Sequence, residues 1–349
     1  MPEPAPPPPR RRYRGVIIGS GSIARTSHYP AFRDTPGVRD RVELAACVDV
    51  WPDALPLDGL PLVTSVDQLT RFAPIDFIDI CTPTGTHVDL AAWGLEQGYH
   101  VLCEKPVALT TAEAARLTAI ARQKQRILAP CHQYRFNPVW RQIAEWLKGG
   151  KIGRWHLAEF AVHRLAADRG VVPAGAAPWR GTRAGGRGGV LVDHGAHLVY
   201  QLLDVGGPPS AVTAWTGRLR HADYDVEDTA SVLLEYPGGN RVATLLLTWA
   251  GTRRDNLVRF IGDAGMIELE GGELRLERGG EVERRDVSGS LDKSAYAGWF
   301  GGLFEDFVAA LDRGEPARYL DDITGVAAVL EAAYASAAAG RRQPVTLGA

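Results

Sequence analysis

The sequence predicts an α/β protein in which a domain with a parallel sheet precedes an α+β domain with a mainly antiparallel, open sheet. Three observations lead to this fold class. Short apolar runs alternate with helical stretches over residues 14–134, the pattern of right-handed βαβ crossovers. These runs are continuously apolar, as in a sheet covered on both faces. Over residues 135–349, strand-like runs follow one another at hairpin spacing, with turn signals between them.

Residues 1–13 precede this pattern and form a leader rich in proline and arginine. Such a run favours an extended, solvated chain and cannot pack a core. It is either a docking peptide or an unstructured leader, and we expect the unstructured leader. Because it contains no apolar segment, we do not expect a secretory signal.

The composition is that of an ordinary globular protein. The chain of 349 residues carries 39 basic and 41 acidic side chains, for a formal charge of −2, and 45% of its residues are hydrophobic. This charge argues against a nucleic-acid or membrane-surface partner, and no apolar run reaches the ~18–20 residues that span a bilayer. The four cysteines form no C-x-x-C pair, which disfavours disulfides and zinc sites. We therefore expect a cytoplasmic protein with neither a membrane nor a nucleic acid as its partner.

The N-terminal elements are predicted from the spacing of their apolar residues. In chain order, we expect strands at Gly15–Gly19, Val42–Asp49, Ile75–Cys81 and Tyr99–Cys103, and helices at Ser22–Arg33, Gly85–Gln97 and Thr111–Lys124. Parallel strands end at one edge of their sheet, and this edge is where open α/β sheets bind ligands.

The C-terminal elements follow from the same patterns. We expect strands at Trp155–Arg164, Ala211–Gly217, Ala230–Glu235, Arg241–Trp249, Leu257–Ile261 and Met266–Glu270, and a final strand at 345–347. Helices are expected at Pro138–Lys148, Gly189–Leu203, Trp299–Leu311 and Asp322–Ala339, packed on one face of this sheet.

A glycine-rich loop separates the first strand from the first helix. Gly19, Gly21 and Ala24 form a G-x-G-x-x-A pattern that encloses Ser22 and Ile23. The first glycine permits a tight turn, the second lets the backbone approach a pyrophosphate, and the alanine allows close helix–sheet packing. The helix N-terminus offers amide donors to the phosphates. The loop predicts a dinucleotide-binding domain of the Rossmann type, and a glycine turn without a ligand is the alternative.

An acidic residue ends the second strand, where a carboxylate can accept hydrogen bonds from the adenosine ribose. This residue is Asp49, and Val50 and Trp51 follow it instead of a basic side chain. A carboxylate there repels the 2′-phosphate of NADP, so we expect NAD, with NADP as the second choice. The alternative is that Asp49 is a surface acid.

Two charged residues follow the strand that ends at Cys103. Pro106 fixes its own φ and pushes Lys105 into an extended conformation, which aims the lysine side chain at the ligand-binding edge. Taken by itself, the neighbouring Glu104 is better explained as a simple ion pair with Lys105. Because this edge of the sheet binds ligands, Glu104 and Lys105 are also candidates for contact with the cofactor.

A second polar cluster lies on the helix expected at Gly189–Leu203. Asp193 and His197 stand four residues apart and share a helix face, so the carboxylate can orient the imidazole and stabilise its protonated form for proton transfer. His194, at the next position, is expected to point elsewhere. An exposed polar turn is an alternative, and a metal site is disfavoured because no further ligand stands at a suitable spacing.

Other candidates are weaker. Thr82, Pro83 and His87 follow the strand that ends at Cys81 and are placed to line a cofactor cleft. Arg135 and Arg180 either bind a polar substrate or carry surface charge. Trp179, which adjoins Arg180, and His194 are the other candidates for contact with the substrate. His28 has no partner visible in the sequence, so we interpret it as a structural histidine.

Together these motifs resemble the glucose–fructose oxidoreductase/inositol dehydrogenase (Gfo/Idh/MocA) family over nearly the whole chain. The likeness rests on the glycine loop with His28, on Asp49, on 81–87, on Glu104-Lys105-Pro106, on Arg135-Phe-Asn-Pro138, on Trp179-Arg180 and on Asp193-x-x-x-His197. Many members continue H-x-x-D after the histidine, whereas this chain has Tyr200 there. This departure removes one acid near the cleft and leaves the substrate open.

The resemblance implies an NAD(P)-dependent oxidoreductase that interconverts a hydroxyl and a ketone on a sugar, cyclitol or sugar derivative. It implies that His197 is the proton acceptor, that Asp193 orients it and that Lys105 holds the reacting oxygen. It also implies a homodimer or homotetramer. Two other functions stay open: a lyase or glycosidase that uses NAD for transient oxidation, and a non-catalytic NAD(P)-sensing regulator.

Overall fold

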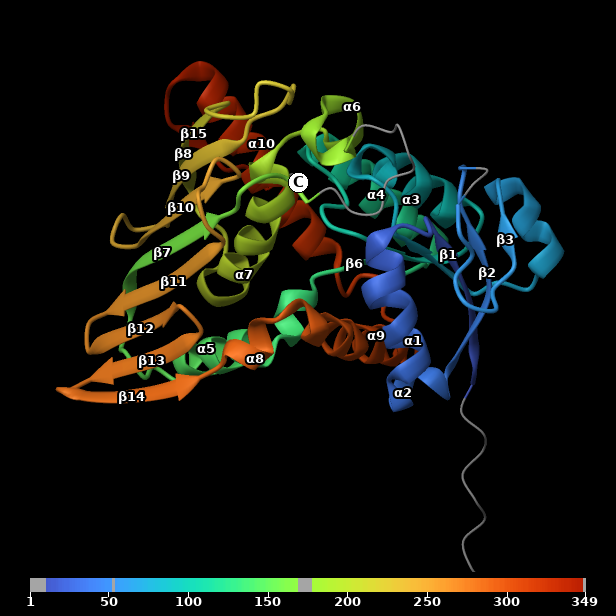
Figure 1. The fold of residues 1–349 in the computed structure, drawn as a ribbon, viewed down its shortest axis with the longest axis horizontal. Helices are drawn as coiled ribbons and strands as arrows, with labels where there is room; N and C mark the ends of the chain where they lie inside the picture. The colour runs from blue at the N-terminus through green and yellow to red at the C-terminus, as the bar shows by residue number, and fades with distance from the viewer. Residues whose placement is uncertain (1–10, 52–53, 169–177, 348–349) are drawn as a thin grey trace, which may run out of the picture.

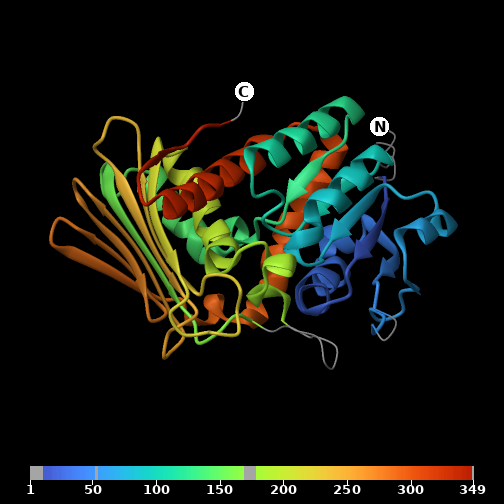
Figure 2. The same ribbon diagram turned by 90° about the horizontal axis from the view of Figure 1, so that it is seen from above.

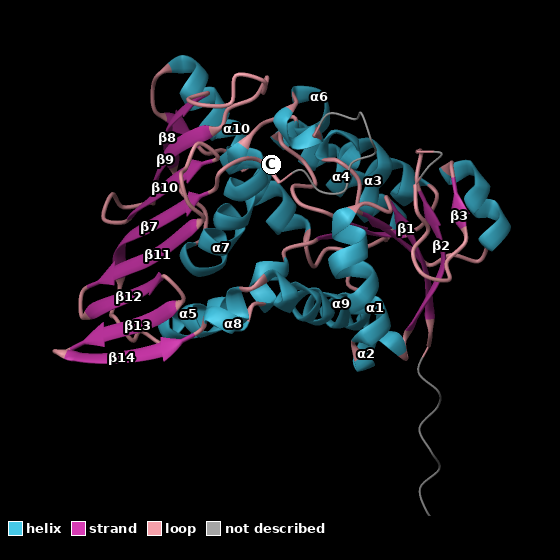
Figure 3. Cartoon of the chain, viewed as in Figure 1, coloured by secondary structure: helices cyan, strands magenta, loops and turns pink. Residues whose placement is uncertain are grey.

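The structure is a computed structural model that describes residues 11–51, 54–168 and 178–347. Its two sheets lie at opposite ends of the molecule with most of the helices between them (Figure 1). Figure 3 shows the same division by secondary structure. Of the proline-rich leader, residues 1–10 lie outside the described residues, and Tyr13 already opens the first strand.

The first sheet is parallel and six-stranded, in the order β3-β2-β1-β4-β5-β6. Its strands are β1 (Tyr13–Ile18), β2 (Val42–Val48), β3 (Leu62–Val63), β4 (Phe77–Ile80), β5 (His100–Cys103) and β6 (Leu128–Pro130). The strand order reverses between β1 and β4, which opens a crevice beyond their carboxyl ends. The predicted Rossmann fold is confirmed. The sequence patterns missed β3 and β6, which are too short to show a periodicity.

The helices of this domain are α1 (Tyr29–Asp34), α2 (Pro36–Arg39), α3 (His87–Glu96) and α4 (Thr111–Lys124). A capping box fixes the start of α4: the Thr110 side chain accepts the amide of Glu113, whose carboxylate in turn accepts the amide of Thr110. The helix expected at Ser22–Arg33 is present, but a π-helical turn at Ala24–His28 interrupts it before α1.

The second sheet has nine strands, in the order β14-β13-β12-β11-β7-β10-β9-β8-β15, and only β7 and β10 pair in parallel. The strands are β7 (Trp155–His163), β8 (Ala211–Gly217), β9 (Thr229–Glu235), β10 (Val242–Thr248), β11 (Asp255–Gly262), β12 (Gly265–Glu270), β13 (Glu273–Arg278), β14 (Glu281–Asp286) and β15 (Gln343–Pro344). The mainly antiparallel sheet was predicted. Strands β13 and β14 were missed because both consist mostly of charged residues, and β14 is also an exposed edge strand. The last strand begins at Gln343 instead of at 345.

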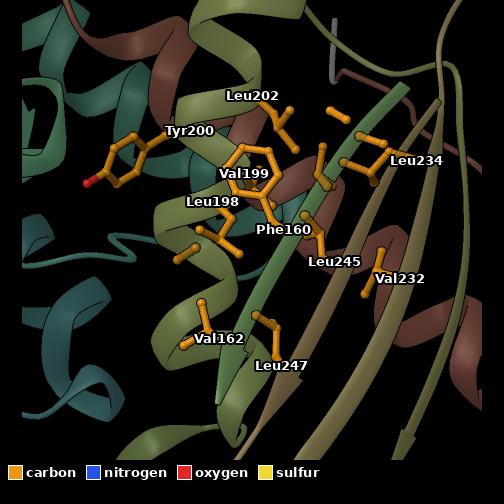
Figure 4. Packing of buried hydrophobic residues seen from close by; sticks show 14 of the residues in the cluster. Phe160, Val162, Leu198, Val199, Tyr200, Leu202, Val232, Leu234, Leu245 and Leu247 are labelled. Atoms are coloured by element: carbon orange, nitrogen blue, oxygen red, sulfur yellow. The ribbon is translucent and has the colours of Figure 1, made fainter. Parts of the chain in front are cut away.

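The helices that follow β6 are α5 (Pro138–Lys148), α6 (Arg183–Gly186), α7 (Ala196–Gly206), α8 (Ser288–Leu291), α9 (Tyr296–Arg313) and α10 (Leu320–Ala339). Helices cover one face of the large sheet and leave the other uncovered (Figure 2). In the core between α7 and the sheet, Val199 and Leu202 pack near Phe160 and Leu245, whereas Tyr200 lies on the side of α7 away from the strands (Figure 4).

One predicted packing is wrong. The helix expected at Trp299–Leu311 forms within α9, but it packs on the first domain and not on the large sheet. Phe304 stacks on Phe32 of α1 with ring centroids 4.0 Å apart, and Phe307 meets Phe77 of β4 edge-on. The apolar face of α9 was evident in the sequence, but periodicity does not say which sheet a helix covers.

Candidate active site

A cleft of about 1840 Å³ lies between the two domains. The predicted site residues that line it are Gly19, Gly21, Ser22, Ile23, Asp49, Thr82, Pro83, His87, Glu104, Lys105, Trp179, Arg180, Asp193, His194 and His197. Ala24 is buried directly beneath the loop, as its expected packing role requires. The cleft therefore brings the predicted cofactor residues and the predicted chemical residues to one place.

The glycine loop has the shape of a phosphate cradle. Gly19 has φ +96, and a Cβ there would lie 2.9 Å from the backbone carbon of Cys81, so only glycine fits. At Gly21 a Cβ would meet no atom within 4 Å, so no part of the protein crowds this face of the loop. An open backbone beside a helix N-terminus suits a pyrophosphate. The loop thus fits a dinucleotide cofactor.

Asp49 is fixed at the other end of this loop. Its Oδ2 accepts hydrogen bonds from the amide and the hydroxyl of Ser20, at 2.9 and 3.0 Å, and its Oδ1 accepts the amide of Trp51 at 3.1 Å. The half-exposed Trp51 also lines the cleft, a contribution that sequence reasoning missed. These contacts hold a negative charge where an adenosine ribose would lie.

His87 joins two of the turns that form the cleft. One ring nitrogen lies 2.9 Å from the carbonyl oxygen of Thr82, and the other lies 2.8 Å from that of Pro106. Burial lowers the pKa of His87. Because both nitrogens face backbone carbonyls, His87 holds the turn after β4 against the turn that carries Lys105.

Lys105 reaches across the domain boundary. Its Nζ donates to the backbone oxygen of Asp193 at 2.6 Å and lies 3.1 Å from the Oδ1 of that residue. The two side chains are only 10% and 16% exposed. Burial raises the pKa of Asp193, but Lys105 and Arg180 outweigh it and hold this pKa well below its usual range. The alternative of a simple Glu104–Lys105 ion pair is wrong.

Glu104 pairs instead with His28 in the core beneath the cleft. The Nε2 of His28 lies 3.0 Å from Glu104, and its Nδ1 lies 2.8 Å from Asp79. Burial lowers the pKa of His28, but the two carboxylates outweigh it and raise this pKa to about 9. His28 is therefore a structural histidine, as predicted. Cys131 is close enough for a metal site with His28 and Asp79, but both ring nitrogens already face carboxylates.

The predicted contact between Asp193 and His197 is wrong. Within the described residues no hydrogen bond joins them, and the Oδ2 of Asp193 lies 3.1 Å from the Nδ1 of His194. The reason is a π-helical turn at Leu191–Gly195, which widens the helix and changes which residues share a face. His194, expected to point elsewhere, lines the cleft.

His197 takes its partner from farther along α7. Its Nδ1 lies 3.0 Å from the hydroxyl of Tyr200, which also accepts the amide of Tyr134 at 3.1 Å. The ring of His132 stacks on Tyr200 at 4.0 Å. Burial, with the charge of Lys105 next, holds the pKa of His197 well below its usual range. A phenol thus contacts the histidine from the position where many members of the resembled family carry an acid.

Of the two arginines predicted to contact the substrate, one lines the cleft and the other does not. The guanidinium of Arg180 lies over the ring of Trp179 at 4.2 Å, and its Nε lies 3.5 Å from Asp193. Arg135 does not line the cleft, because its guanidinium makes two contacts, 2.5 and 2.8 Å long, with Asp322 of α10. The prediction of a substrate contact by Arg135 is therefore corrected.

The side chains on the C-terminal wall of the cleft that were not predicted from the sequence include Tyr134, Arg164, Arg254 and Tyr296. Two of them flank strands, since Arg164 directly follows β7 and Arg254 directly precedes β11. A basic residue at the end of a predicted strand was visible in the sequence, but only the pairing of β7 with β11 makes these two arginines neighbours.

Comparisons with known protein families agree with the division of this chain into two domains. The domain family described as "Oxidoreductase family, NAD-binding Rossmann fold" matches residues 13–132, and the "GFO/IDH/MocA C-terminal domain" matches residues 140–268. In the part of the chain that the structure describes, no helix is long and apolar enough to cross a bilayer.

Individual relatives cover different shares of the chain. The oxidoreductase YdgJ of Escherichia coli is 32% identical over 63% of this chain and 61% of its own length. The first curated relatives are thus matched over about three fifths of their length. D-apiose dehydrogenase of Paraburkholderia graminis is 26% identical over 95% of this chain and 89% of its own. The crystal structure of GenD2 from gentamicin A biosynthesis, in complex with NAD, has a TM-score of 0.80 and 26% identity over 98% of this chain and 99% of its own.

Proposed function

Because this chain belongs to the GFO/IDH/MocA family of oxidoreductases, we propose that it is an NAD-dependent dehydrogenase that interconverts a hydroxyl and a ketone on a sugar, cyclitol or sugar derivative. The observation that carries the proposal is the position of Lys105. It contacts Asp193 of the second domain in the same cleft as His197 and the glycine cradle.

Each residue has a role that its surroundings support. The Lys105 ammonium binds the reacting oxygen and stabilises the negative charge that develops there, an effect that grows in a site from which water is excluded. Asp193 holds Lys105 through two contacts. His197 turns Nδ1 to Tyr200, so Nε2 is the nitrogen left to exchange a proton with the substrate. When bound, NAD supplies the hydride chemistry.

Specificity for the cofactor is assigned to Asp49, since its fixed carboxylate suits a ribose with free hydroxyls better than a phosphorylated one. All four cysteines are free and buried, which agrees with the reducing cytoplasm that we propose as the location. We further propose that the uncovered face of the nine-stranded sheet forms a homodimer or homotetramer.

The test is a substrate panel. Polyols, cyclitols, ketoses and sugar acids are offered with NAD and NADP in both directions, and NADH absorbance is followed against product. A dehydrogenase forms one NADH for each ketone. Turnover without net NADH indicates the lyase or glycosidase alternative, and no turnover with any compound supports the sensing alternative.

A further inference from the structure

We propose that the substrate carries an anionic group, a carboxylate or a phosphate, and that Arg164 and Arg254 bind it on the C-terminal wall of the cleft. This inference rests on the proposed function of that cleft and adds the chemical class of its substrate. Neither arginine belongs to the motifs that identified the site.

The two arginines are cross-strand neighbours. The antiparallel ladder of β7 and β11 ends where His163 lies opposite Asp255, and Arg164 and Arg254 are the next residues beyond it. The guanidinium of Arg164 reaches the backbone oxygen of Asp255, and the charge of Arg254 is close enough to act on it. Both line the cleft. The fold thus places two positive charges together at its edge.

Arg164 is held by neutral groups alone. Its Nη1 donates to the backbone oxygens of His163 and Asp255, at 2.7 and 3.0 Å, and its Nη2 donates to the side-chain oxygen of Asn256 at 2.9 Å. A guanidinium has five N–H donors, so two of them have no partner within the described residues. The hydrogen bonds fix its position but leave its charge without a carboxylate in contact.

Arg254 adds to this excess charge. Across the described ranges, it makes no hydrogen bond or ion pair. Burial lowers the pKa of Arg164, and the neighbouring charge of Arg254 lowers it further. Asp292 is within electrostatic reach of Arg254, but it is exposed and its Oδ1 accepts the amide of Ser294 at 2.8 Å.

The rest of the wall does not cancel this charge. Its cations are Arg164, Arg180 and Arg254, and its acids are Asp168 and Asp193, which leaves 3 − 2 = +1. Asp193 is already engaged by Lys105 and by Arg180. Tyr134 and Tyr296 of the same wall are neutral: their hydroxyls are 3.2 Å apart, and the ring of Tyr134 is 4.6 Å from that of His197.

A pair of like charges held together is unfavourable unless a ligand or counter-ion compensates it. Guanidinium groups are well suited to compensation by a planar carboxylate or by a phosphate, since their donors match both shapes. A neutral sugar would leave the repulsion between Arg164 and Arg254 in place. The arrangement therefore favours sugar acids or sugar phosphates over neutral polyols.

The test compares uronates, aldonates and sugar phosphates with their neutral parent sugars, using the NAD-loaded enzyme and the variants Arg254→Gln and Arg253→Gln. Arg253 is the matched control, because it adjoins Arg254, is 79% exposed and pairs with Asp255 at 3.0 Å without lining the cleft. We expect the anionic member of a pair to be preferred in kcat/KM. R254Q should raise the KM of the anionic compound and so reduce that preference about 10- to 100-fold, because the variant loses one hydrogen bond to a charged group. R253Q should leave the preference unchanged.

The outcomes separate this inference from the proposed function. Turnover of neutral sugars with equal or better kcat/KM, and no change in R254Q, overturns the inference but leaves a dehydrogenase. If no compound is turned over, the proposed function fails, and binding of D-glucuronate and of D-glucose 6-phosphate is then measured by quenching of NADH fluorescence. Binding that weakens both at higher salt concentration and in R254Q supports the anion site. Binding of glucuronate then indicates a carboxylate site, and binding of glucose 6-phosphate indicates a phosphate site. If neither ligand binds, or if neither salt nor R254Q weakens the binding, the inference is overturned.

Discussion

The hydroxyl of Tyr200 lies 3.0 Å from the Nδ1 of His197 and also accepts the amide of Tyr134. Burial raises the pKa of Tyr200 well above its usual value, so the phenol keeps its proton. A buried O–H without an acceptor is unfavourable, and His197 is its acceptor among the described residues. The neutral imidazole should therefore carry its hydrogen on Nε2, from which it can donate a hydrogen bond to the carbonyl oxygen of a ketone substrate.

Replacing Tyr200 by Phe should free His197 to adopt either tautomer. We expect kcat for ketone reduction to fall about tenfold with little change in KM, because a hydrogen bond that positions the proton donor is worth about 1 kcal/mol or more. The matched control is Tyr236→Phe, which removes another buried hydroxyl, one without a partner within the described residues and outside the cleft. Nitrogen NMR of the histidines should show His197 shift toward the other tautomer in Y200F alone. An unchanged kcat and an unchanged spectrum would rule out this role.

Lys105→Met should reduce kcat about 10²- to 10³-fold, the loss typical of one preorganised donor to a developing oxyanion. NADH binding, followed by fluorescence, should stay within a few-fold of the wild type. The variant also leaves the buried carboxylate of Asp193 without its cation, which can destabilise the fold by about 3–5 kcal/mol. The double variant K105M/D193N removes that charge and should regain stability without regaining turnover. Wild-type turnover in a folded K105M variant would contradict the assignment.

Asp49→Ala should change the choice of cofactor. Loss of a carboxylate that accepts hydrogen bonds from the ribose hydroxyls should raise the Kd for NAD about 10-fold. Because the carboxylate no longer repels the 2′-phosphate, the Kd for NADP should also move closer to that for NAD. Titration of both cofactors by fluorescence measures the ratio. Asp40→Ala serves as the control, because this acid is exposed beyond α2 and away from the cleft. A ratio of NAD to NADP affinity unchanged in D49A would remove Asp49 from cofactor recognition.

The buried His28 should make stability depend on pH. Its pKa is raised from 6.5 to about 9 in the folded protein, so its stabilisation is complete below pH 6.5 and is lost as the pH rises through 9. The difference amounts to about 3 kcal/mol, at 1.36 kcal/mol for each pH unit. Asp79 and Glu104 face the ring directly, and the Sγ of Cys81 lies 3.2 Å from Nδ1.

Urea unfolding of the wild type between pH 6.5 and 9 should show this decline in the free energy of unfolding. Asp79→Asn weakens the support for the imidazolium and should shift the decline to lower pH. Carbon NMR of the His28 ring provides a direct titration that does not depend on a variant folding. A His28 ring that titrates near 6.5 would exclude a protonated His28 at neutral pH.

Much of the fold was predictable because local patterns encode it. Strand β2 follows an apolar run that ends in Asp49, and α4 carries its own capping box. The loop at Gly19 could be predicted because glycine is the residue that adopts its positive φ without strain. Three features could not be predicted from the sequence. They are the π-helical turn that redirects Asp193, the packing of α9 on the first domain, and the pairing of β7 with β11 that brings Arg164 near Arg254. These contacts depend on long-range geometry that a periodicity does not contain.

The uncovered face of the nine-stranded sheet bears a row of side chains that should be buried between two copies of the chain. Through the strand pairings, Trp215 lies opposite Ser231, and this row continues through Leu246, Ala161 and Leu257. Trp215 and Leu246 are 50% and 45% exposed. An apolar strip on a flat sheet face is typical of an interface between subunits.

A glutamate at Trp215 should therefore separate the subunits, because a charge cannot be buried there without a partner. Sedimentation equilibrium at micromolar concentration should give a dimer or tetramer for the wild type and a monomer for Trp215→Glu. Leu219→Glu is the control, since Leu219 is 65% exposed in the loop after β8 and lies outside the sheet. It should leave the assembly intact. A monomeric wild type would show that this face remains open to solvent, and an assembly that survives W215E would place the interface elsewhere.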